Sequence, residues 1–502
     1  MRPDLLWPTL LASGAATAYL SCLSKSYVFE GLARAMPIQL GTLSEVFKGT
    51  YLLYGALGYA FHGLLGLIVL QPLAVVSLQI MDAFFGAGGL VFFYHALRRL
   101  EIPPRAAAAW AAALGGSLGY ALWSTDAQAY IFSTFVLAAD WYLLAALVSG
   151  RKVSPIALGA AHAAAIFAHI VNGVFGAAIL WLLWKVHGAR WRRPALLYAA
   201  SAAAIVLAGY AAVLILIVRP ASMADLRLWL IGSLATATGE ARWHTGLGLG
   251  GLWYWLKMTL NIFVSMGPAP AALLWAARAV LAVLAVTALA SLRRLQGPAK
   301  SAAGACAAWL AAYALVFTSW EPHTMVYRVS DLLPLFTLLA LGTNTFLPRW
   351  RAAAPALLAA LLATANFSAE LKPRSLEANN PRLARMRFIK AHTPENGWVI
   401  AATADAGNDE LYIPFFAERR PIVLARYDVD PEALPRRLRA MLAAGEQVYA
   451  TSRVLAEDRW NRLLAPFHPK AAGDDGMGLV VYRLGKTNST TLNSSSGSPL
   501  SE

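Results

Sequence analysis

The sequence predicts a mainly α-helical, polytopic membrane protein that ends in a small α/β domain. Hydrophobic residues make up 58% of its 502 residues and charged residues only 14%, a more apolar balance than that of a typical soluble domain. Apolar runs long enough to cross a bilayer recur from residue 5 to about residue 370, and short arginine clusters separate them. From Pro373 the composition becomes that of a soluble domain. We therefore expect a membrane domain over residues 1–370, a soluble domain over 371–486 and a disordered Ser/Thr/Asn-rich tail over 487–502.

The formal charge of +15 indicates membrane orientation rather than nucleic-acid binding, because the arginines stand in short clusters between apolar runs. The two cysteines, Cys22 and Cys306, fall within or at the edge of apolar runs and have no close spacing. They therefore indicate neither a disulfide framework nor a metal site. The apolar run 5–23 has no convincing cleavage site after it and is expected to be an uncleaved signal anchor.

Positive charge decides how the first apolar runs divide into spans. Residues 50–97 are apolar enough for two spans, but two spans would place Arg98, Arg99 and Arg105 outside, against the positive-inside rule. We therefore expect residues 50–71 to lie along the outer surface, as part of an outer loop over 24–71. About eleven transmembrane helices result: 5–23, 73–97, 106–123, 130–148, 156–168, 173–184, 196–218, 268–292, 302–317, 332–347 and 354–366.

This topology places the C-terminal domain on the outer side. Strand-like segments at 398–403, 421–425, 447–451 and 479–484 alternate there with helix-period segments at 409–418, 431–444 and 453–464, after a first helix at 381–391. Strands that alternate with helices predict a small α/β domain with a mainly parallel sheet.

The candidates for chemistry are polar side chains at the outer ends of the spans, because charge within a bilayer is costly. By the predicted topology they collect at one membrane face, where they line a single cavity. They are Glu30 in the first loop and, farther along the chain, Asp126, Gln128, Tyr130, His169, Asn172, Arg219, Glu240, Arg242, His244, Lys257, Glu321, His323, Tyr327, Arg328 and Asp331. A carboxylate, imidazoles and several cations in one cavity suit group transfer with an anionic leaving group, since the carboxylate removes a proton and the cations stabilise a departing phosphate.

An ordered set of loose motifs resembles a known family. After the anchor and the acidic loop come YLLYGALGYAF, LQIMDAFFGAGGLVFFYHALRRL, ALGYALWSTDAQAY, HIVNGVF and EPHTMVYRVSDLLPL. Over residues 5–370 this order resembles the GT-C superfamily of integral membrane glycosyltransferases, especially bacterial members of the protein mannosyltransferase and aminoarabinose transferase type. None of these motifs is specific alone, so their order and sidedness carry the resemblance.

The resemblance implies transfer of a sugar from a polyprenyl-phosphate carrier to an acceptor hydroxyl of a glycan, lipid or protein. The reaction is expected at the extracytoplasmic face of a bacterial inner membrane, with Glu30 as general base. Arg328, with His323, Arg242 and His244, is expected to bind the carrier phosphate. The sugar or acceptor is expected to contact Asp126, Gln128, Tyr130, His169 and Asn172. Some relatives use a divalent metal such as Mg²⁺ or Mn²⁺, but no ligand set is spelled out in this sequence.

Simpler interpretations stay open for several of these residues. Glu45 is a rival base to Glu30, and Asp126 has the position of a helix cap. Where some relatives carry a carboxylate two residues before a loop tyrosine, this chain has Gln128, which leaves a second acidic role open. His169 and Asn172 suit interhelical hydrogen bonds, and Arg328 has the acidic neighbours Glu321 and Asp331.

Two other classes of function compete with the transferase. A lipid-linked glycan transporter, or a scaffold without catalysis, would need no base, but a transporter should carry polar groups through the midplane. An oligosaccharide polymerase or ligase would share the carrier and the membrane side but use whole oligosaccharides.

Overall fold

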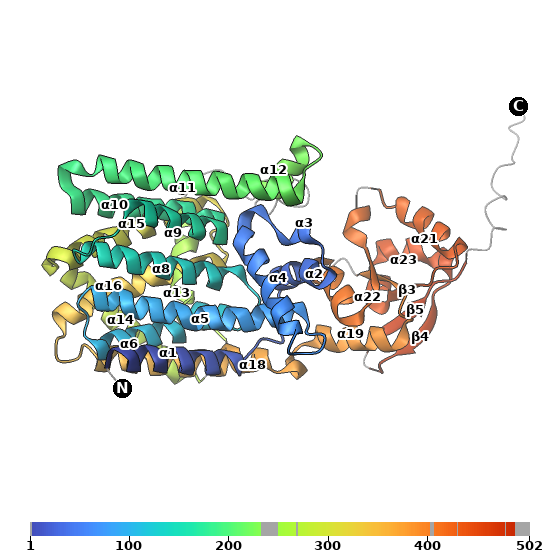
Figure 1. Cartoon of the computed structure of the whole chain (residues 1–502). Helices are drawn as coiled ribbons and strands as arrows, with labels where there is room; N and C mark the ends of the chain where they lie inside the picture. The colour runs from blue at the N-terminus through green and yellow to red at the C-terminus, as the bar shows by residue number, and fades with distance from the viewer. Residues whose placement is uncertain are drawn as a thin grey trace, which may run out of the picture. The chain divides into compact units, whose positions relative to one another are not determined.

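The computed structural model describes residues 3–231, 249–267, 270–401, 406–428, 430–476 and 478–486. The chain divides into two compact units, Met1–Leu376 and Glu377–Glu502. The first is helical and the second contains a sheet (Figure 1). The sequence division at 370/371 and the structural division at 376/377 differ by six residues, because the last membrane helix runs through a π-helical turn, Phe367–Leu371, into a short further helix, α18 (Lys372–Ser375).

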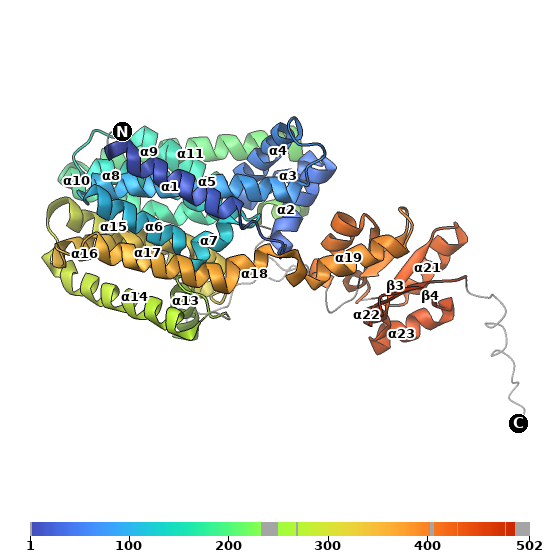
Figure 2. The same ribbon diagram turned by 90° about the horizontal axis from the view of Figure 1, so that it is seen from below.

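The first unit is a bundle whose long helices run side by side (Figures 1 and 2). Its helices outside the 24–71 loop are α1 Pro3–Leu20, α5 Ala74–Arg99, α6 Pro104–Gly116, α7 Leu118–Ser124, α8 Ala129–Val148, α9 Pro155–Ala168, α10 Gly176–His187, α11 Arg192–Val213, α12 Met223–Ile231, α13 Leu249–Asn261, α14 Ala271–Ser291, α15 Gly297–Ser319, α16 Leu332–Phe346 and α17 Ala353–Asn366.

Eight helical segments of the described chain are long and apolar enough to cross a membrane. They are Ala74–Arg99, Ala129–Val148, Ile170–Arg190, Arg192–Val218, Ala271–Arg294, Gly297–Ser319, Met325–Phe346 and Ala353–Ser375. Two shorter apolar helices, Leu5–Leu20 and Pro155–Ala168, accompany them. The protein is therefore an integral membrane protein, while the count of eleven spans stays a prediction.

The loop over residues 24–71 folds into short helices that gather at one end of the bundle (Figure 1). They are α2 Phe29–Leu40, α3 Leu43–Val46, the 3₁₀ turn η1 Gly49–Tyr51, and α4 Leu52–Gly66. α2 ends at Gly41, whose φ of 70° suits a residue without a side chain. α4 packs against α5 and α9, and with 15 residues it is shorter than a membrane span.

Small residues allow the buried helices of the bundle to approach closely. The Tyr120 hydroxyl of α7 donates a hydrogen bond of 2.8 Å to the Gly86 carbonyl of α5. A Cβ atom added to Gly89 would lie only 2.3 Å from the same hydroxyl. Small residues at helix contacts are typical of membrane bundles, and here they bring α5 against the segment that precedes α8.

The second unit is an α/β domain around a five-stranded sheet. Its elements are α19 Pro381–His392, β1 Trp398–Ala401, α20 Ala406–Tyr412, β2 Arg420–Val423, α21 Ala433–Ala443, β3 Val448–Thr451, α22 Ser452–Leu455, α23 Asp458–Leu464, β4 Lys470–Asp474 and β5 Val480–Arg483. The strand order is β2-β1-β3-β5-β4; the first three strands pair in parallel, and β5 and β4 join in antiparallel fashion. Sequence analysis did not predict β4, because its KAAGD segment lacks the β-branched and aromatic residues that favour strands.

Candidate active site

Tyr51 is the centre of a polar and aromatic cluster at the loop end of the bundle. Its hydroxyl lies 2.8 Å from the Tyr130 hydroxyl at the start of α8. Its ring lies 4.7 Å from the His169 ring and under the Arg34 guanidinium, which is 4.3 Å from the ring centroid. Tyr327 joins from the other side, with its ring 5.4 Å from that of Tyr130. Four separate segments of the chain therefore meet at one point.

Glu30 belongs to this cluster. It lies half-buried in the first turn of α2, where the helix dipole favours a carboxylate. Its charge interacts with the hydroxyl groups of Tyr51, Tyr130 and Tyr327. Arg34 follows four residues later and therefore lies on the same face of α2. The acidic Glu30 and the basic Arg34 thus both interact with Tyr51.

The surroundings keep the Tyr51 hydroxyl protonated at neutral pH. Burial raises its pKa above the ordinary value, the Glu30 carboxylate raises the pKa further, and Arg34 acts in the opposite direction. A neutral hydroxyl can both donate and accept hydrogen bonds, so Tyr51 can connect Tyr130 to a bound ligand.

Lys48 adds a second cation beside Arg34. Burial lowers the pKa of the Lys48 ammonium, the Glu45 carboxylate raises it, and the positive charge of Arg34 lowers it. Glu45 itself is exposed, whereas Lys48 and Arg34 are half-buried. Two neighbouring cations on the loop side of Tyr51 form a place where an anion would be stabilised.

The segment before α8 touches α2 directly. A Cβ atom added to Gly31 would lie 2.8 Å from the Ala127 carbonyl oxygen, so only glycine fits next to Glu30. Asp126 is fully buried, and its Oδ1 accepts a 2.9 Å hydrogen bond from the Ala127 N–H rather than capping α8. Burial raises the pKa of Asp126 to about 7, although the Ala127 N–H and the charge of Arg374 lower it.

Gln128 is positioned through its backbone. Its N–H donates a 2.9 Å hydrogen bond to Oδ2 of Asp82, and the same oxygen accepts a 2.8 Å hydrogen bond from the Tyr54 hydroxyl of α4. Asp82 therefore joins the loop, α5 and the start of α8, which fixes where Tyr130 begins the helix. This arrangement agrees with a packing role for Asp82.

His169 and Asn172 lie in the segment that links α9 to α10. The His169 Nδ1 accepts a 3.1 Å hydrogen bond from the Val171 N–H, and burial together with Arg34 lowers the pKa of His169 to about 3. The Asn172 amide donates to the Ser133 hydroxyl at 2.8 Å and accepts from the Tyr313 hydroxyl at 2.8 Å. His169 is thus a neutral ring in the cluster, while Asn172 forms interhelical hydrogen bonds.

Arg328 follows Tyr327 but points into the protein. Its side chain is fully buried, 4.0 Å over the Phe317 ring and 3.6 Å from Oδ2 of Asp331. His323 is exposed and its ring lies 5.0 Å from that of Tyr254. The burial of Arg328 makes it less accessible to a phosphate than Arg34 and Lys48 are.

Arg242 and His244, the other two predicted phosphate ligands, lie outside the described residues. Within the ranges that the structure describes, no group of three or more His, Cys, Asp or Glu side chains could hold a metal ion. The predicted divalent metal therefore has no ligand set in this part of the chain, and the mechanism below assigns it no step.

Sequence analysis placed Glu30, Tyr130 and His169 among the candidates, and the structure brings these three together. It assigned no role to Arg34, Lys48 or Tyr51. The spacing of four residues between Glu30 and Arg34 could have indicated Arg34, because such pairs share a helix face. Nothing in the sequence pattern distinguished Tyr51 from the other tyrosines near the spans.

The fold and this cluster define an integral membrane protein with a polar site built on a loop at one end of its bundle. The whole chain has the fold of ArnT from Cupriavidus metallidurans bound to undecaprenyl phosphate: the TM-score is 0.68 at 13% sequence identity, over 95% of this chain and 98% of that one. The apo state of the same enzyme gives a TM-score of 0.65 at 13% identity, over 95% and 97% of the two chains. The predicted resemblance is therefore confirmed at the level of the fold, which this chain shares with ArnT. No protein-family model and no curated protein matches the sequence.

Proposed function

We propose that this protein is a glycosyltransferase that moves a sugar from a polyprenyl-phosphate carrier to an acceptor hydroxyl. One observation carries the proposal: Glu30 and Arg34 act on Tyr51 at the loop end of the bundle, and Lys48 lies near Arg34. The likeness to ArnT bound to undecaprenyl phosphate supports the choice of carrier. We place the reaction at the extracytoplasmic face of a bacterial inner membrane, where the predicted topology puts the loop.

In this mechanism Glu30 accepts the proton of the acceptor hydroxyl as its oxygen attacks the anomeric carbon of the sugar. The bond between that carbon and the phosphate oxygen breaks, and the carrier phosphate leaves as an anion. Arg34 and Lys48 stabilise its negative charge, since charge-assisted hydrogen bonds to phosphate are stronger than neutral ones. The Tyr51 hydroxyl, oriented by Tyr130, completes the wall of the site.

This assignment moves the phosphate site from Arg328 and His323 to the two loop cations. Arg328 is fully buried with the Asp331 carboxylate 3.6 Å away, so a phosphate reaches it less readily than a half-exposed cation. Arg34 and Lys48 are half-buried, and the positive charge of Arg34 lowers the pKa of Lys48, although the Glu45 carboxylate raises it. Asp126, Tyr130 and His169 border the sugar side of the cluster in this proposal.

The test is incubation of purified protein with a panel of polyprenyl-phosphate sugars, with detection of both the released carrier phosphate and the glycosylated acceptor. The Glu30→Gln variant should lower kcat by about 10²- to 10⁴-fold, the usual contribution of a general base. Glu45→Gln is the matched control and should retain activity, because Glu45 is exposed.

Undiminished transfer by a folded Glu30→Gln variant would remove Glu30 from the mechanism. Loss of transfer in Glu45→Gln with retention in Glu30→Gln would assign the base to Glu45. Movement of a lipid-linked glycan across sealed vesicles without any glycosidic product would replace the transferase by a transporter.

A further inference from the structure

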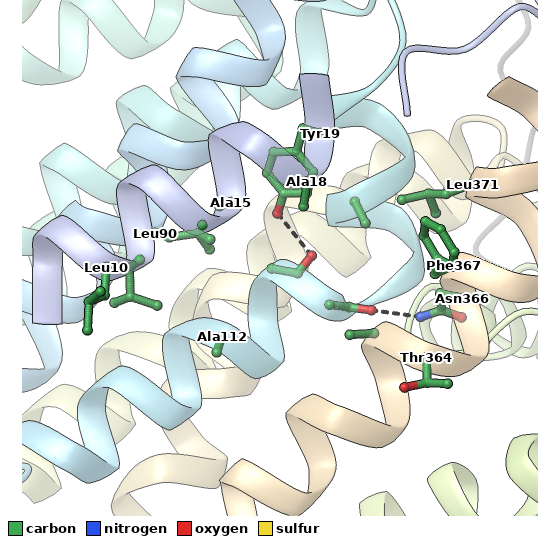
Figure 3. A pocket seen from close by; sticks show the side chains of 16 residues that line it. Leu10, Ala15, Ala18, Tyr19, Leu90, Ala112, Thr364, Asn366, Phe367 and Leu371 are labelled. Atoms are coloured by element: carbon green, nitrogen blue, oxygen red, sulfur yellow. Dashed lines mark hydrogen bonds between the residues drawn. The ribbon is translucent and has the colours of Figure 1, made fainter. Parts of the chain in front are cut away.

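A second site lies away from the Tyr51 cluster, between α1, α6 and α17. It is a cavity of about 500 Å³ (Figure 3), a volume typical of ligand pockets. Small residues on the three helices leave this space: Gly14, Ala15, Ala18, Ala112, Gly115, Gly116 and Ala363. A Cβ atom added to Gly14 would meet no other atom within 4 Å, so this residue borders open space.

Two of the polar side chains around the cavity, those of Tyr19 and Asn366, already have partners. The Tyr19 hydroxyl donates a 2.9 Å hydrogen bond to the Gly115 carbonyl, and the Asn366 amide donates to the Gly116 carbonyl at 2.8 Å (Figure 3). Oδ1 of Asn366 accepts from the Ser265 N–H at 2.9 Å. The Thr364 hydroxyl is the remaining polar side-chain group of the lining, and a water molecule needs two to four polar partners. The cavity therefore suits a hydrocarbon chain.

The cavity runs along the apolar helix α1 and opens at the surface of the bundle. On α1 it extends from Leu10 to Tyr19, which is about 14 Å of helix. Leu10 and Phe367 border it and are 52% and 45% exposed. A hydrocarbon chain of the surrounding bilayer can enter such a slot from the side.

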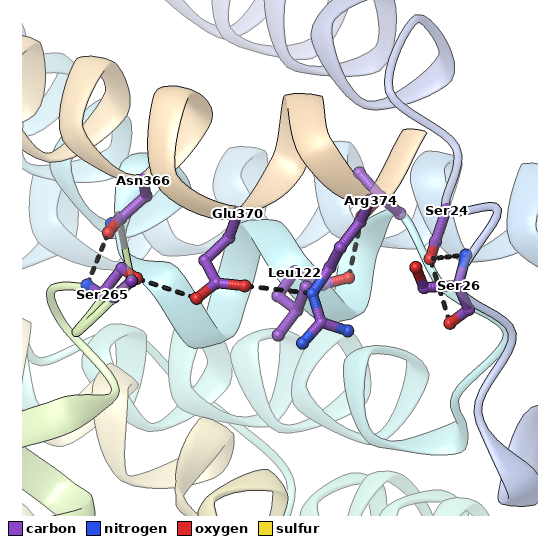
Figure 4. Close-up of polar contacts among 9 residues, drawn as sticks. Ser24, Ser26, Leu122, Ser265, Asn366, Glu370 and Arg374 are labelled. Atoms are coloured by element: carbon purple, nitrogen blue, oxygen red, sulfur yellow. Dashed lines mark hydrogen bonds and ion pairs between the residues drawn. The ribbon is translucent and has the colours of Figure 1, made fainter. Parts of the chain in front are cut away.

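An arginine follows the last lining residue of the cavity along the chain. Leu371 is the last lining residue, and Arg374 comes one helical turn later, with about a third of its side chain exposed. Arg374 donates through Nε to Glu370 at 3.1 Å, and Glu370 also accepts from the Ser265 hydroxyl at 2.9 Å (Figure 4). The backbone N–H of Lys25 donates a 2.7 Å hydrogen bond to the Arg374 carbonyl.

We propose that this cavity binds one acyl chain of a membrane phospholipid whose anionic headgroup lies against Arg374. The apolar walls select a hydrocarbon chain, and the arginine at the end of the slot selects a negatively charged phosphate group. The site does not depend on the proposed glycosyl transfer, since it shares no side chain with the Tyr51 cluster.

The chain-binding half is tested with full-length protein in vesicles that contain phosphatidylglycerol with a photoactivatable group on its acyl chain. Cross-links should map to the lining residues of α1 and α17. A Cβ atom at position 14 meets no atom within 4 Å, and we expect Gly14→Leu, which places a side chain at the slot, to lower this labelling about tenfold, the effect of displacing about two methylene groups. Gly63→Leu in α4 is the matched control, because a side chain there also meets open space but lies outside the cavity.

The headgroup half is tested with the same label on phosphatidylcholine. Wild-type protein should favour phosphatidylglycerol, and Arg374→Gln should remove most of that preference while acyl-chain labelling of α1 persists. Unchanged labelling in Gly14→Leu would overturn the proposal, and so would equal labelling by both lipids in wild-type protein. Stronger labelling of the same residues by a photoactivatable polyprenyl phosphate would assign the slot to the carrier instead.

Discussion

The candidate active site has two halves that use charge in different ways. The loop half consists of Glu30, Arg34 and Lys48, all half-buried on the segment between α1 and α5. The core half consists of Asp126, Tyr130, His169 and the Arg328–Asp331 pair, all buried at the ends of bundle helices. Tyr51 joins them through its hydrogen bond to Tyr130.

The difference shows which charges remain available to a ligand. In the core half, burial favours the neutral forms of Asp126 and His169, and Arg328 lies next to Asp331. In the loop half, Arg34 and Lys48 keep partial access to solvent and lie near each other. We therefore expect changes in the loop half to affect turnover and changes in the core half to affect folding.

The largest expected effect is in the core half. Asp331→Asn leaves the Arg328 charge buried without its partner, which should cost about 3–5 kcal/mol of stability. Thermal unfolding in detergent measures this loss. The double variant Arg328→Met, Asp331→Leu should recover most of it, because it removes both charges. A stable Asp331→Asn single variant would show that the pair is not a structural unit.

Changes to the loop cations should act on the donor substrate. Arg34→Gln and Lys48→Gln should each lower kcat/KM by about 10- to 100-fold, which matches about 1.5–3 kcal/mol for a charge-assisted hydrogen bond. Their unfolding temperatures should stay close to that of the unaltered protein. Arg349→Gln, at an exposed arginine in another loop, is the control. If either loop variant loses stability without losing turnover, the distinction between the halves fails.

Asp126 predicts a pH dependence in the core half. Its pKa of about 7 in the folded protein exceeds the ordinary value near 4, so the folded state binds more protons and stability falls as pH rises through this window. Asn at position 126 cannot ionise. The free energy of unfolding of Asp126→Asn, taken relative to that of the unaltered protein, should therefore rise by on the order of 2 kcal/mol from pH 5 to pH 8. Urea unfolding at both values measures the gain. A difference that does not change with pH would contradict it.

His169 predicts the opposite slope. Its pKa of about 3 lies below the ordinary value near 6.5, so stability is complete above pH 6.5 and is lost as pH falls toward 3. Relative to the unaltered protein, His169→Gln should be more stable at pH 5 than at pH 7.5, with a difference in the free energy of unfolding of about 2 kcal/mol. Parallel unfolding curves at the two pH values would show that the ring is not buried in its neutral form.

Local patterns in the sequence anticipated much of the architecture. The apolar runs predicted the membrane helices, and the strands β1, β2, β3 and β5 lie where alternation of strand and helix patterns placed them. β4 was missed because an exposed edge strand needs no apolar pattern. The sheet is parallel across β2, β1 and β3, whereas β5 pairs with β3 in antiparallel fashion. The sequence pattern did not indicate this direction, because it depends on a turn geometry that periodicity does not encode.

The site was anticipated less completely. Glu30 and His169 stood out as rare polar residues near the ends of apolar runs, which composition alone can show. The sequence did not show that Arg328 is buried. A charged residue at the end of an apolar run is equally consistent with binding a ligand and with pairing to Asp331. The roles of Arg34, Lys48 and Tyr51 depend on how α2 and η1 fold back over the start of α8.

The sequence by itself determined that this chain enters a membrane, where its soluble domain begins and which polar residues are unusual enough to suspect. Those properties follow from transfer of side chains between water and lipid, which each segment expresses independently of the others. Only the tertiary structure decided which charges face a ligand and which are sealed in the core. Burial and pairing depend on neighbours that are distant in sequence. Two residues of the same type can therefore differ: Arg34 is half-buried, whereas Arg328 is fully buried.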